Sequence, residues 1–156
     1  MPVDLAKAKR AIEMAETGGG RNNWPRVEAA YIPAKESPFV AQNSLIRGSG
    51  ACVNAIVEAR WERFAGSDEQ LGTAASWGPW QIMYHTAADM GYTGEPSALH
   101  KREVCEKYVD KRLEQIVRSG AETIEQVADA WNSGNFRDKI VPADYIAKVK
   151  VYYAQA

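Results

Sequence analysis

Glu58 is the side chain of this sequence best suited to acid–base chemistry. An apolar stripe predicts a helix over residues 51–64, and it consists of Val53, Ile56, Val57, Trp61 and Phe64. Glu58 lies beside Val57, at the edge of this apolar face. A carboxyl group that is partly desolvated near an indole has a raised pKa, because burial disfavours the charged form. Such a group can act as a general acid near neutral pH. Spacing alone, however, favours a solvated helix-surface glutamate without a function.

Two further groups of residues combine indoles with amides. Trp77 and Trp80 flank a Gly-Pro turn that is followed by Gln81, and Trp131 precedes Asn132 in a polar turn. An indole offers a flat apolar face, and an amide both donates and accepts hydrogen bonds, so these residues suit sugar rings. The alternatives are core packing of the two tryptophans around a tight turn and, at Asn132, ordinary capping of a helix C-terminus.

The elements that would position these side chains are mostly helices. We expect the first over residues 4–16, because Asp4 can cap it and Gly18 begins the glycine triplet that ends it. Thr123 and Gln126 match a capping box at the start of another helix. Apolar spacing predicts the further helices over residues 79–90, 97–118, 123–131 and from Pro142 onward, with short ones at 25–31 and 44–47. Residues 65–78 are small and polar, which predicts a loop or a small hairpin.

The composition is that of a folded protein. The chain has 156 residues, 46% hydrophobic and 25% charged, which predicts one domain. A net charge of −1 argues against binding to nucleic acid, which needs a basic excess. No apolar run reaches the roughly 20 residues of a membrane span. Cys52 and Cys105 lie far apart, which excludes a disulfide scaffold and a paired-cysteine metal site. We expect a monomer without metal or cofactor.

Four motifs follow one another along the chain. The first two are Glu58-Ala59-Arg60 and Gly78-Pro79-Trp80-Gln81-Ile82-Met83, the second of which is followed by Thr86-Ala87. The other two are Ala130-Trp131-Asn132-Ser133-Gly134 and Tyr145-Ile146-Ala147-Lys148-Val149. In their order and separations these motifs resemble the soluble lytic transglycosylase and goose-type lysozyme families, over about residues 50–154.

This resemblance implies a lysozyme-like, mostly α fold of the α+β kind, with a small β or loop region near 65–78. Within the single domain over 1–156 that the length predicts, the resemblance makes 50–156 the catalytic core. It does not match the region 1–49, which is expected to be an N-terminal arm with a helix. Glu58 is then the catalytic acid, and Gln81 lines the sugar groove. Asn132 matches the Asn of the family's Ala-Tyr-Asn motif, and Tyr145 reaches toward the catalytic carboxyl. The remaining residues expected to bind substrate are Trp77, Trp80 and Trp131.

The sequence also departs from the family pattern. Ala59 stands where Ser is usual, Pro79-Trp80 replaces Leu-Met, and Gln81 follows Glu58 by 23 positions, more than in short transglycosylases. Asp68 and Glu69 lie in the intervening loop, in the region where goose-type lysozymes have an assisting Asp. Either residue is a candidate for a second catalytic carboxylate, and the alternative is a solvated pair of loop charges.

The expected substrate is the β-1,4 bond between N-acetylmuramic acid and N-acetylglucosamine in the glycan strands of peptidoglycan. After protonation of the leaving oxygen by Glu58, either the muramoyl 6-hydroxyl closes on C1, as in lytic transglycosylation, or water attacks, as in hydrolysis by a lysozyme. The alternatives are a non-catalytic saccharide-binding module and an unrelated helical interaction domain. We expect action at the bacterial cell wall, by a secreted enzyme whose leader is absent from this chain or by a phage protein without a signal peptide.

Overall fold

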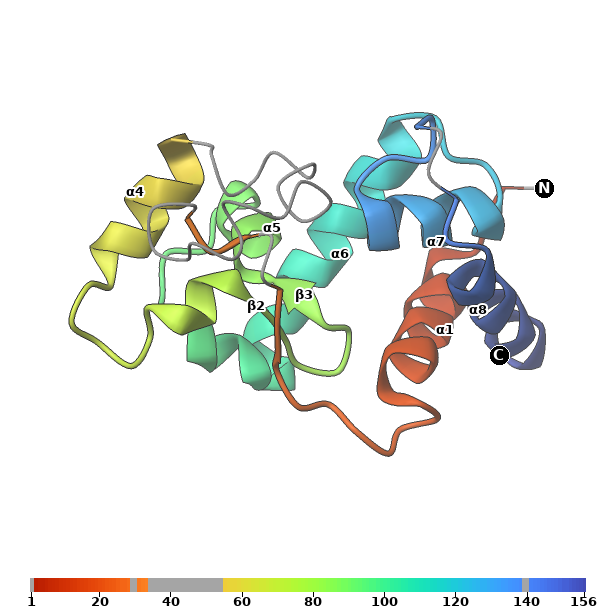
Figure 1. The fold of residues 1–156 in the computed structure, drawn as a ribbon. Helices are drawn as coiled ribbons and strands as arrows, with labels where there is room; N and C mark the ends of the chain where they lie inside the picture. The colour runs from red at the N-terminus through yellow and green to blue at the C-terminus, as the bar shows by residue number, and fades with distance from the viewer. Residues whose placement is uncertain (1, 29–30, 34–54, 139–140) are drawn as a thin grey trace. The chain divides into compact units, whose positions relative to one another are not determined.

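The computed structural model describes residues 2–28, 31–33, 55–138 and 141–156. The chain forms two compact units, the first made of Met1–Asn23 and Glu106–Ala156 and the second of Trp24–Cys105. The described part is mostly helical and carries a small three-stranded antiparallel sheet (Figure 1), which confirms the expected α-rich α+β class. The N-terminal helix packs with the C-terminal ones in the first unit.

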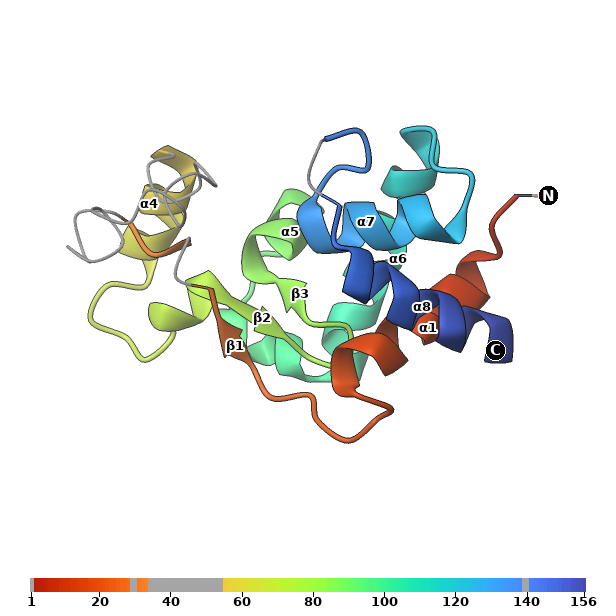
Figure 2. The same cartoon turned by 45° about the vertical axis from the view of Figure 1, so that its right-hand side comes forward.

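Three helices form the core of the first unit, together with most of α6 (Arg102–Arg118). They are α1 (Leu5–Thr17), α7 (Ile124–Ser133) and α8 (Ala143–Gln155). Helix α8 packs against α1 and α7, and Figure 2 shows it running beside α1. The face of α1 turned to the core carries small and apolar side chains at helical spacing, which are Ala8, Ala11, Ile12 and Ala15.

The ends of these helices follow the capping residues in the sequence. The Asp4 side chain accepts a hydrogen bond from the Lys7 backbone amide, and Gly18 ends α1 in the left-handed conformation with φ 60°. Thr123 and Gln126 form the complete reciprocal capping box of α7. The predicted caps are confirmed, and both helices begin and end within two residues of their predicted bounds.

The second unit contains the sheet. Its strands are β1 (Arg26–Val27), β2 (Ala75–Trp77) and β3 (Ile82–Met83), with β2 in the middle. Ser76 of β2 is paired with Arg26 on one side and Met83 on the other. The helical segments that the structure describes in this unit include α4 (Ala55–Arg63), η4 (Leu71–Ala74), α5 (Tyr84–Asp89) and η5 (Pro96–His100). Its core contains Trp80, Ile82, Tyr84 and Leu99, each at most 1% exposed.

Several predicted elements are wrong. The helix expected over 79–90 is a turn, then β3, and only then α5, because Gln81 adopts a left-handed conformation with φ 51° that a helix cannot contain. Residues 26 and 27 are a strand rather than part of a short helix, since they pair with β2. The helix expected over 97–118 is divided at Lys101 into η5 and α6.

The α4 helix matches its prediction over the part that the structure describes. Val57 and Trp61 face the core, but Ile56, expected on the same stripe, is 58% exposed. Residues 51–54 of the predicted helix, the short helix at 44–47 and Cys52 lie outside the described residues. None of the helices within the described ranges is long and apolar enough to cross a membrane.

Candidate functional site

Glu58 lies in the first described turn of α4, half-buried beside the buried side chains of Val57 and Trp61. Within the described ranges its carboxylate has no hydrogen-bond or ion-pair partner. The carboxyl group is therefore partly shielded from solvent but holds no other described residue in place, which leaves it available to a ligand.

Gln81 closes the turn between β2 and β3, and its side chain is only 7% exposed. Its Oε1 accepts a hydrogen bond from Ser76 Oγ at 2.9 Å. Its Nε2 donates to the backbone oxygens of Gly78 and Trp24, each at 3.0 Å. A positive φ is unfavourable for a residue with a side chain, and these bonds hold Gln81 in it. The amide thus fixes the turn and the backbone at Trp24, a positioning role rather than the expected lining of a sugar groove.

The same turn requires a glycine at position 78. Gly78 has φ 75°, and a Cβ placed there would lie 2.7 Å from the Leu99 backbone oxygen and 3.2 Å from Cys105 Sγ. No real Cβ approaches a backbone oxygen so closely, and an L residue would also be strained at this φ. The glycine of the second motif therefore serves close packing of the turn against η5 and the start of α6.

The tryptophans beside the turn are built into the second unit. Trp80 is 0% exposed and has the Arg102 guanidinium 4.8 Å from its ring centroid. Its predicted role in substrate binding is wrong, because a buried indole offers no face to a sugar; core packing, the alternative considered, is what the structure has. Trp77 is half-buried, and its Nε1 donates to the Gly72 backbone oxygen at 2.9 Å.

The two candidate carboxylates of the loop differ in their surroundings. Glu69 accepts hydrogen bonds from the backbone amide of Ser97, at 2.8 Å, and from the Ser97 hydroxyl. Both of its oxygens are therefore engaged in holding the start of η5, a structural role that competes with catalysis. Asp68 is exposed and remains the candidate for a second carboxylate.

The other predicted site residues belong to the first unit. Asn132 is exposed in the last turn of α7, and Trp131 before it is half-buried. Tyr145 is half-buried in the first turns of α8, with its hydroxyl oxygen shielded from solvent. The structure thus places Glu58, Gln81 and the loop carboxylates in one unit and these three residues in the other. A cleft shared by both groups stays a prediction.

An interacting cluster that sequence analysis missed connects α4 with α5. Arg60 Nη2 lies 2.8 Å from Asp89 Oδ1, and Arg60 Nη1 lies 3.1 Å from His85 Nδ1. A guanidinium only donates hydrogen bonds, so His85 Nδ1 is the acceptor and the imidazole proton sits on Nε2. His85 also stacks on Tyr31, with ring centroids 5.3 Å apart. The sequence signal is the i, i+4 spacing of His85 and Asp89, which puts both on one face of α5.

His85 is neutral at physiological pH. Burial, chiefly, and the Arg60 charge lower its pKa from 6.5 to about 4, although Asp89 acts in the opposite direction. Burial also raises the pKa of the Tyr31 phenol, and the charges of Glu28 and Asp89 add to this effect. The cluster therefore has one permanent cation, Arg60, that is held between a carboxylate and a neutral imidazole.

Trp24 is a second feature that the sequence did not single out. Its side chain is 73% exposed, the largest value among the exposed large hydrophobic residues of the described part. Its backbone oxygen is held by Gln81 Nε2, next to β1. An indole in this setting is both fixed at its backbone and open to solvent.

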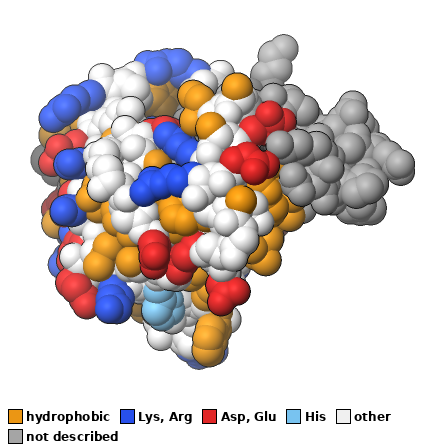
Figure 3. Space-filling view, turned by 90° about the vertical axis from the view of Figure 1, so that its left-hand side faces the viewer, with side chains coloured by type: hydrophobic (Ala, Val, Ile, Leu, Met, Phe, Trp, Pro, Cys, Tyr) orange, Lys and Arg blue, Asp and Glu red, His pale blue; other side chains and the backbone are white. Residues whose placement is uncertain are grey.

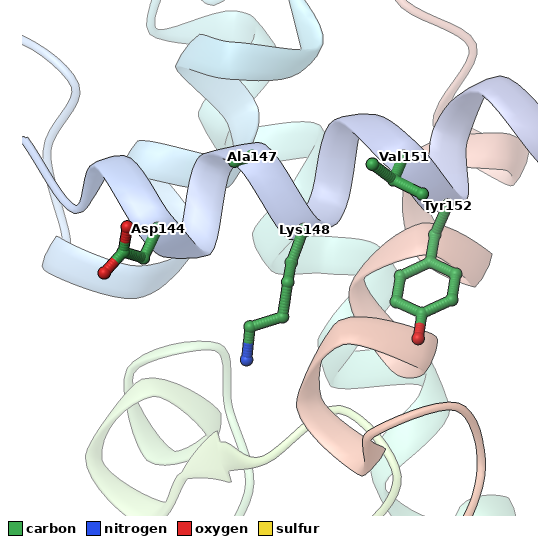
Figure 4. Close-up of a pocket in the computed structure, with 5 residues that line it drawn as sticks. All are labelled: Asp144, Ala147, Lys148, Val151 and Tyr152. Carbon is green, nitrogen blue, oxygen red and sulfur yellow. The ribbon is translucent and has the colours of Figure 1, made fainter.

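A separate open hollow lies along one face of α8 (Figure 4). It is lined by Asp144, Ala147, Lys148, Val151 and Tyr152, and the close-up shows Lys148 and Tyr152 projecting to the same side of the helix. None of the predicted site residues lines it. In the part of the chain that the structure describes, no group of three or more His, Cys, Asp or Glu side chains is placed to hold a metal ion.

Comparison with known proteins adds no relative: no protein-family model matches the chain, and neither does any curated protein or solved structure. The resemblance to lytic transglycosylases and goose-type lysozymes accordingly stays a prediction, which rests on the four motifs and their order.

Proposed function

We propose that this protein is a glycosidase that cleaves the β-1,4 bond between N-acetylmuramic acid and N-acetylglucosamine in peptidoglycan, with Glu58 as the general acid and base. The observation that carries the proposal is the state of the Glu58 carboxyl. It is half-buried on α4 and has no partner within the described ranges. The motif order, the α-rich fold and the tightly fixed Gly78–Gln81 turn support it.

The chemistry needs only one carboxyl group in its first step. Glu58 donates its proton to the leaving glycosidic oxygen, and a positively charged centre develops at C1 of the muramoyl residue. In transglycosylation the Glu58 carboxylate then takes the proton of the muramoyl 6-hydroxyl as that oxygen bonds to C1, which gives a 1,6-anhydro product. An inverting hydrolase instead needs a second carboxylate about 6.5–9.5 Å away to activate water. Asp68 is the candidate for that role, because Glu69 is engaged by Ser97.

The side chains proposed to contact the sugar rings are chosen by their exposure to solvent. Trp24, which is 73% exposed, replaces the buried Trp80 as the indole proposed to lie against a sugar ring of the strand. Trp77, Trp131, Asn132 and Tyr145 keep their proposed roles in binding the glycan strand. In this proposal the protein acts at the bacterial cell wall.

The deciding experiment is turbidity clearing of purified bacterial cell walls by the Glu58→Gln variant. Loss of the proton donor should lower the rate at least a hundredfold, because positioned acid catalysis contributes about 10²–10⁴. Glu62→Gln, which changes an exposed glutamate one turn further along α4, is the matched control and should clear walls normally. Circular dichroism verifies that both variants fold.

Two outcomes separate the proposal from its alternatives. If Glu58→Gln clears walls at the normal rate, Glu58 is not the acid. If the unaltered protein binds walls but never clears them, the protein is a saccharide-binding module. Mass spectrometry of the released fragments then distinguishes the two reactions. Transglycosylation leaves anhydro-muramoyl ends, whereas hydrolysis leaves reducing ends.

A further inference from the structure

In the part of the chain that the structure describes, helix α4, which carries Glu58, buries few of its side chains. Only Val57 and Trp61 of its nine residues are buried. A helix of this length is not stable by itself in water, so its position depends on tertiary contacts. Besides these two side chains, the contacts that hold it include a hydrogen bond from Gln70 Nε2 to the Trp61 oxygen, at 3.3 Å, and one from Arg63 Nη2 to the Thr93 oxygen, at 2.9 Å.

Arg60 attaches α4 to α5 through three polar contacts. It follows Glu58 by two residues, which places the two side chains on roughly opposite sides of the helix. Its side chain is 22% exposed and forms the ion pair with Asp89 at 2.8 Å. The same guanidinium bonds His85 through Nδ1 at 3.1 Å and approaches the His85 backbone oxygen at 3.5 Å. It is therefore held at several points of α5, from the first turn to the last residue.

The acceptor on α5 is itself rigid. His85 is buried, stacks on Tyr31 and packs edge-on against Tyr84, so its ring has little freedom to follow a moving arginine. Only a guanidinium can satisfy the imidazole and the carboxylate together in one plane, since a lysine ammonium is a single compact centre. The pairing of Arg60 with His85 and Asp89 thus specifies one position of α4 relative to α5.

We propose that Arg60 is a positioning residue that fixes Glu58 by clamping α4 to α5 through His85 and Asp89. The proposal rests on the function proposed for Glu58. Arg60 itself touches no substrate. Misplacing a catalytic group by about 1 Å can lower a rate a hundredfold, so loss of the clamp acts on the chemical step rather than on binding.

The test compares Arg60→Ala and Arg60→Lys with Arg118→Ala. The control removes an arginine of α6 whose side chain is 80% exposed and which, within the described ranges, pairs only with Glu114 one turn away. Hydrogen exchange of the α4 amides is measured in each variant, together with kcat and KM on isolated peptidoglycan. Arg60→Ala should accelerate exchange in α4 at least tenfold and lower kcat tenfold to a hundredfold, with KM within about twofold. Arg60→Lys should restore part of both effects, and Arg118→Ala should change neither.

Unchanged α4 exchange and unchanged kcat in Arg60→Ala overturn the proposal. Equal acceleration of exchange throughout residues 55–105 overturns it as well, because Arg60 would then be a general stabilising residue. If Arg60→Ala does not fold, Asp89→Ala and His85→Ala each remove one side of the clamp and take its place with the same expectations. Normal clearing by Glu58→Gln would contradict the proposed function alone, and the exchange measurement would still decide whether the clamp exists.

Discussion

Single residues show what the sequence could and could not predict about the candidate site. The types and order of Glu58, Gln81 and Glu69 were available from the sequence, and they led to a chemical hypothesis. The sequence could not show whether the polar atoms of these side chains are free, because their hydrogen-bond partners lie far away along the chain. Gln81 is bound to the Trp24 oxygen across 57 positions, and Glu69 to Ser97 across 28. Only the fold distinguishes the available carboxyl of Glu58 from these two engaged side chains.

His85 should make stability depend on pH. Its pKa is about 4 in the folded protein and 6.5 in the unfolded chain, so between these values only the unfolded chain binds the proton. The free energy of unfolding should therefore fall as the pH is lowered from about 6.5 to 4, by about 3 kcal/mol for a shift of this size. Below pH 4 the contribution of His85 is lost completely. Urea unfolding measured at several pH values between 4 and 7.5 tests this.

The matched variant for this measurement is His85→Gln, whose amide oxygen can still accept from Arg60 but does not titrate. The carboxylates contribute equally to the pH dependence of the free energy of unfolding in both proteins. The difference between the two curves of unfolding free energy against pH therefore gives the contribution of the imidazole alone. The variant should lose less stability than the unaltered protein across this range. Parallel curves would mean that His85 is not shielded as the structure has it.

Helices and strands could be predicted from the sequence where the residues that determine their ends lie close together along the chain. The boundaries of α1 and α7 followed from Asp4, Gly18 and the Thr123–Gln126 box, because caps act over three or four residues. The segment 79–83 is predicted to begin a helix but forms a turn and β3, since a strand of two residues carries no detectable alternation. What makes it a turn is the backbone of Leu99 packed against Gly78, a contact that no local pattern reveals.

Gly78→Ala should therefore destabilise the second unit strongly. The added Cβ meets the Leu99 oxygen at 2.7 Å at a backbone φ of 75°. Backbone strain and overpacking together should cost roughly 2–4 kcal/mol. Gly66→Ala is the control, because Gly66 has the same φ of 75° but no atom within 4 Å of the added Cβ. The Gly66→Ala variant should lose only the free energy of unfolding that backbone strain costs, about 1–2 kcal/mol. Thermal or urea unfolding measures this loss. Equal losses in both variants would show that the close packing at Gly78 contributes nothing.

The molecule as a whole has almost no net charge, and this bears on how it would bind a cell wall. The total is −1 for 19 basic and 20 acidic residues. On the face drawn in Figure 3, Lys and Arg side chains are interspersed with Asp and Glu, and apolar side chains lie between them. Such a surface produces no strong field of one sign, so it offers little long-range attraction to an anionic polymer. In the proposed function, binding to glycan strands is then expected to come from short-range contacts such as an exposed indole.

Cell-wall binding should accordingly be insensitive to salt and sensitive to Trp24. The non-cleaving Glu58→Gln variant should bind isolated peptidoglycan with a Kd that changes less than about twofold between 50 and 200 mM NaCl, because screening acts on attraction between charges. Adding Trp24→Ala should weaken binding roughly three- to tenfold, as expected for loss of an aromatic contact worth about 0.5–1.5 kcal/mol. Trp24→Phe, which keeps a flat ring, should retain most of the affinity.

Co-sedimentation with peptidoglycan measures the affinity of all three proteins. Steep weakening with salt, unaffected by Trp24→Ala, would instead assign binding to charged side chains and remove Trp24 from the site.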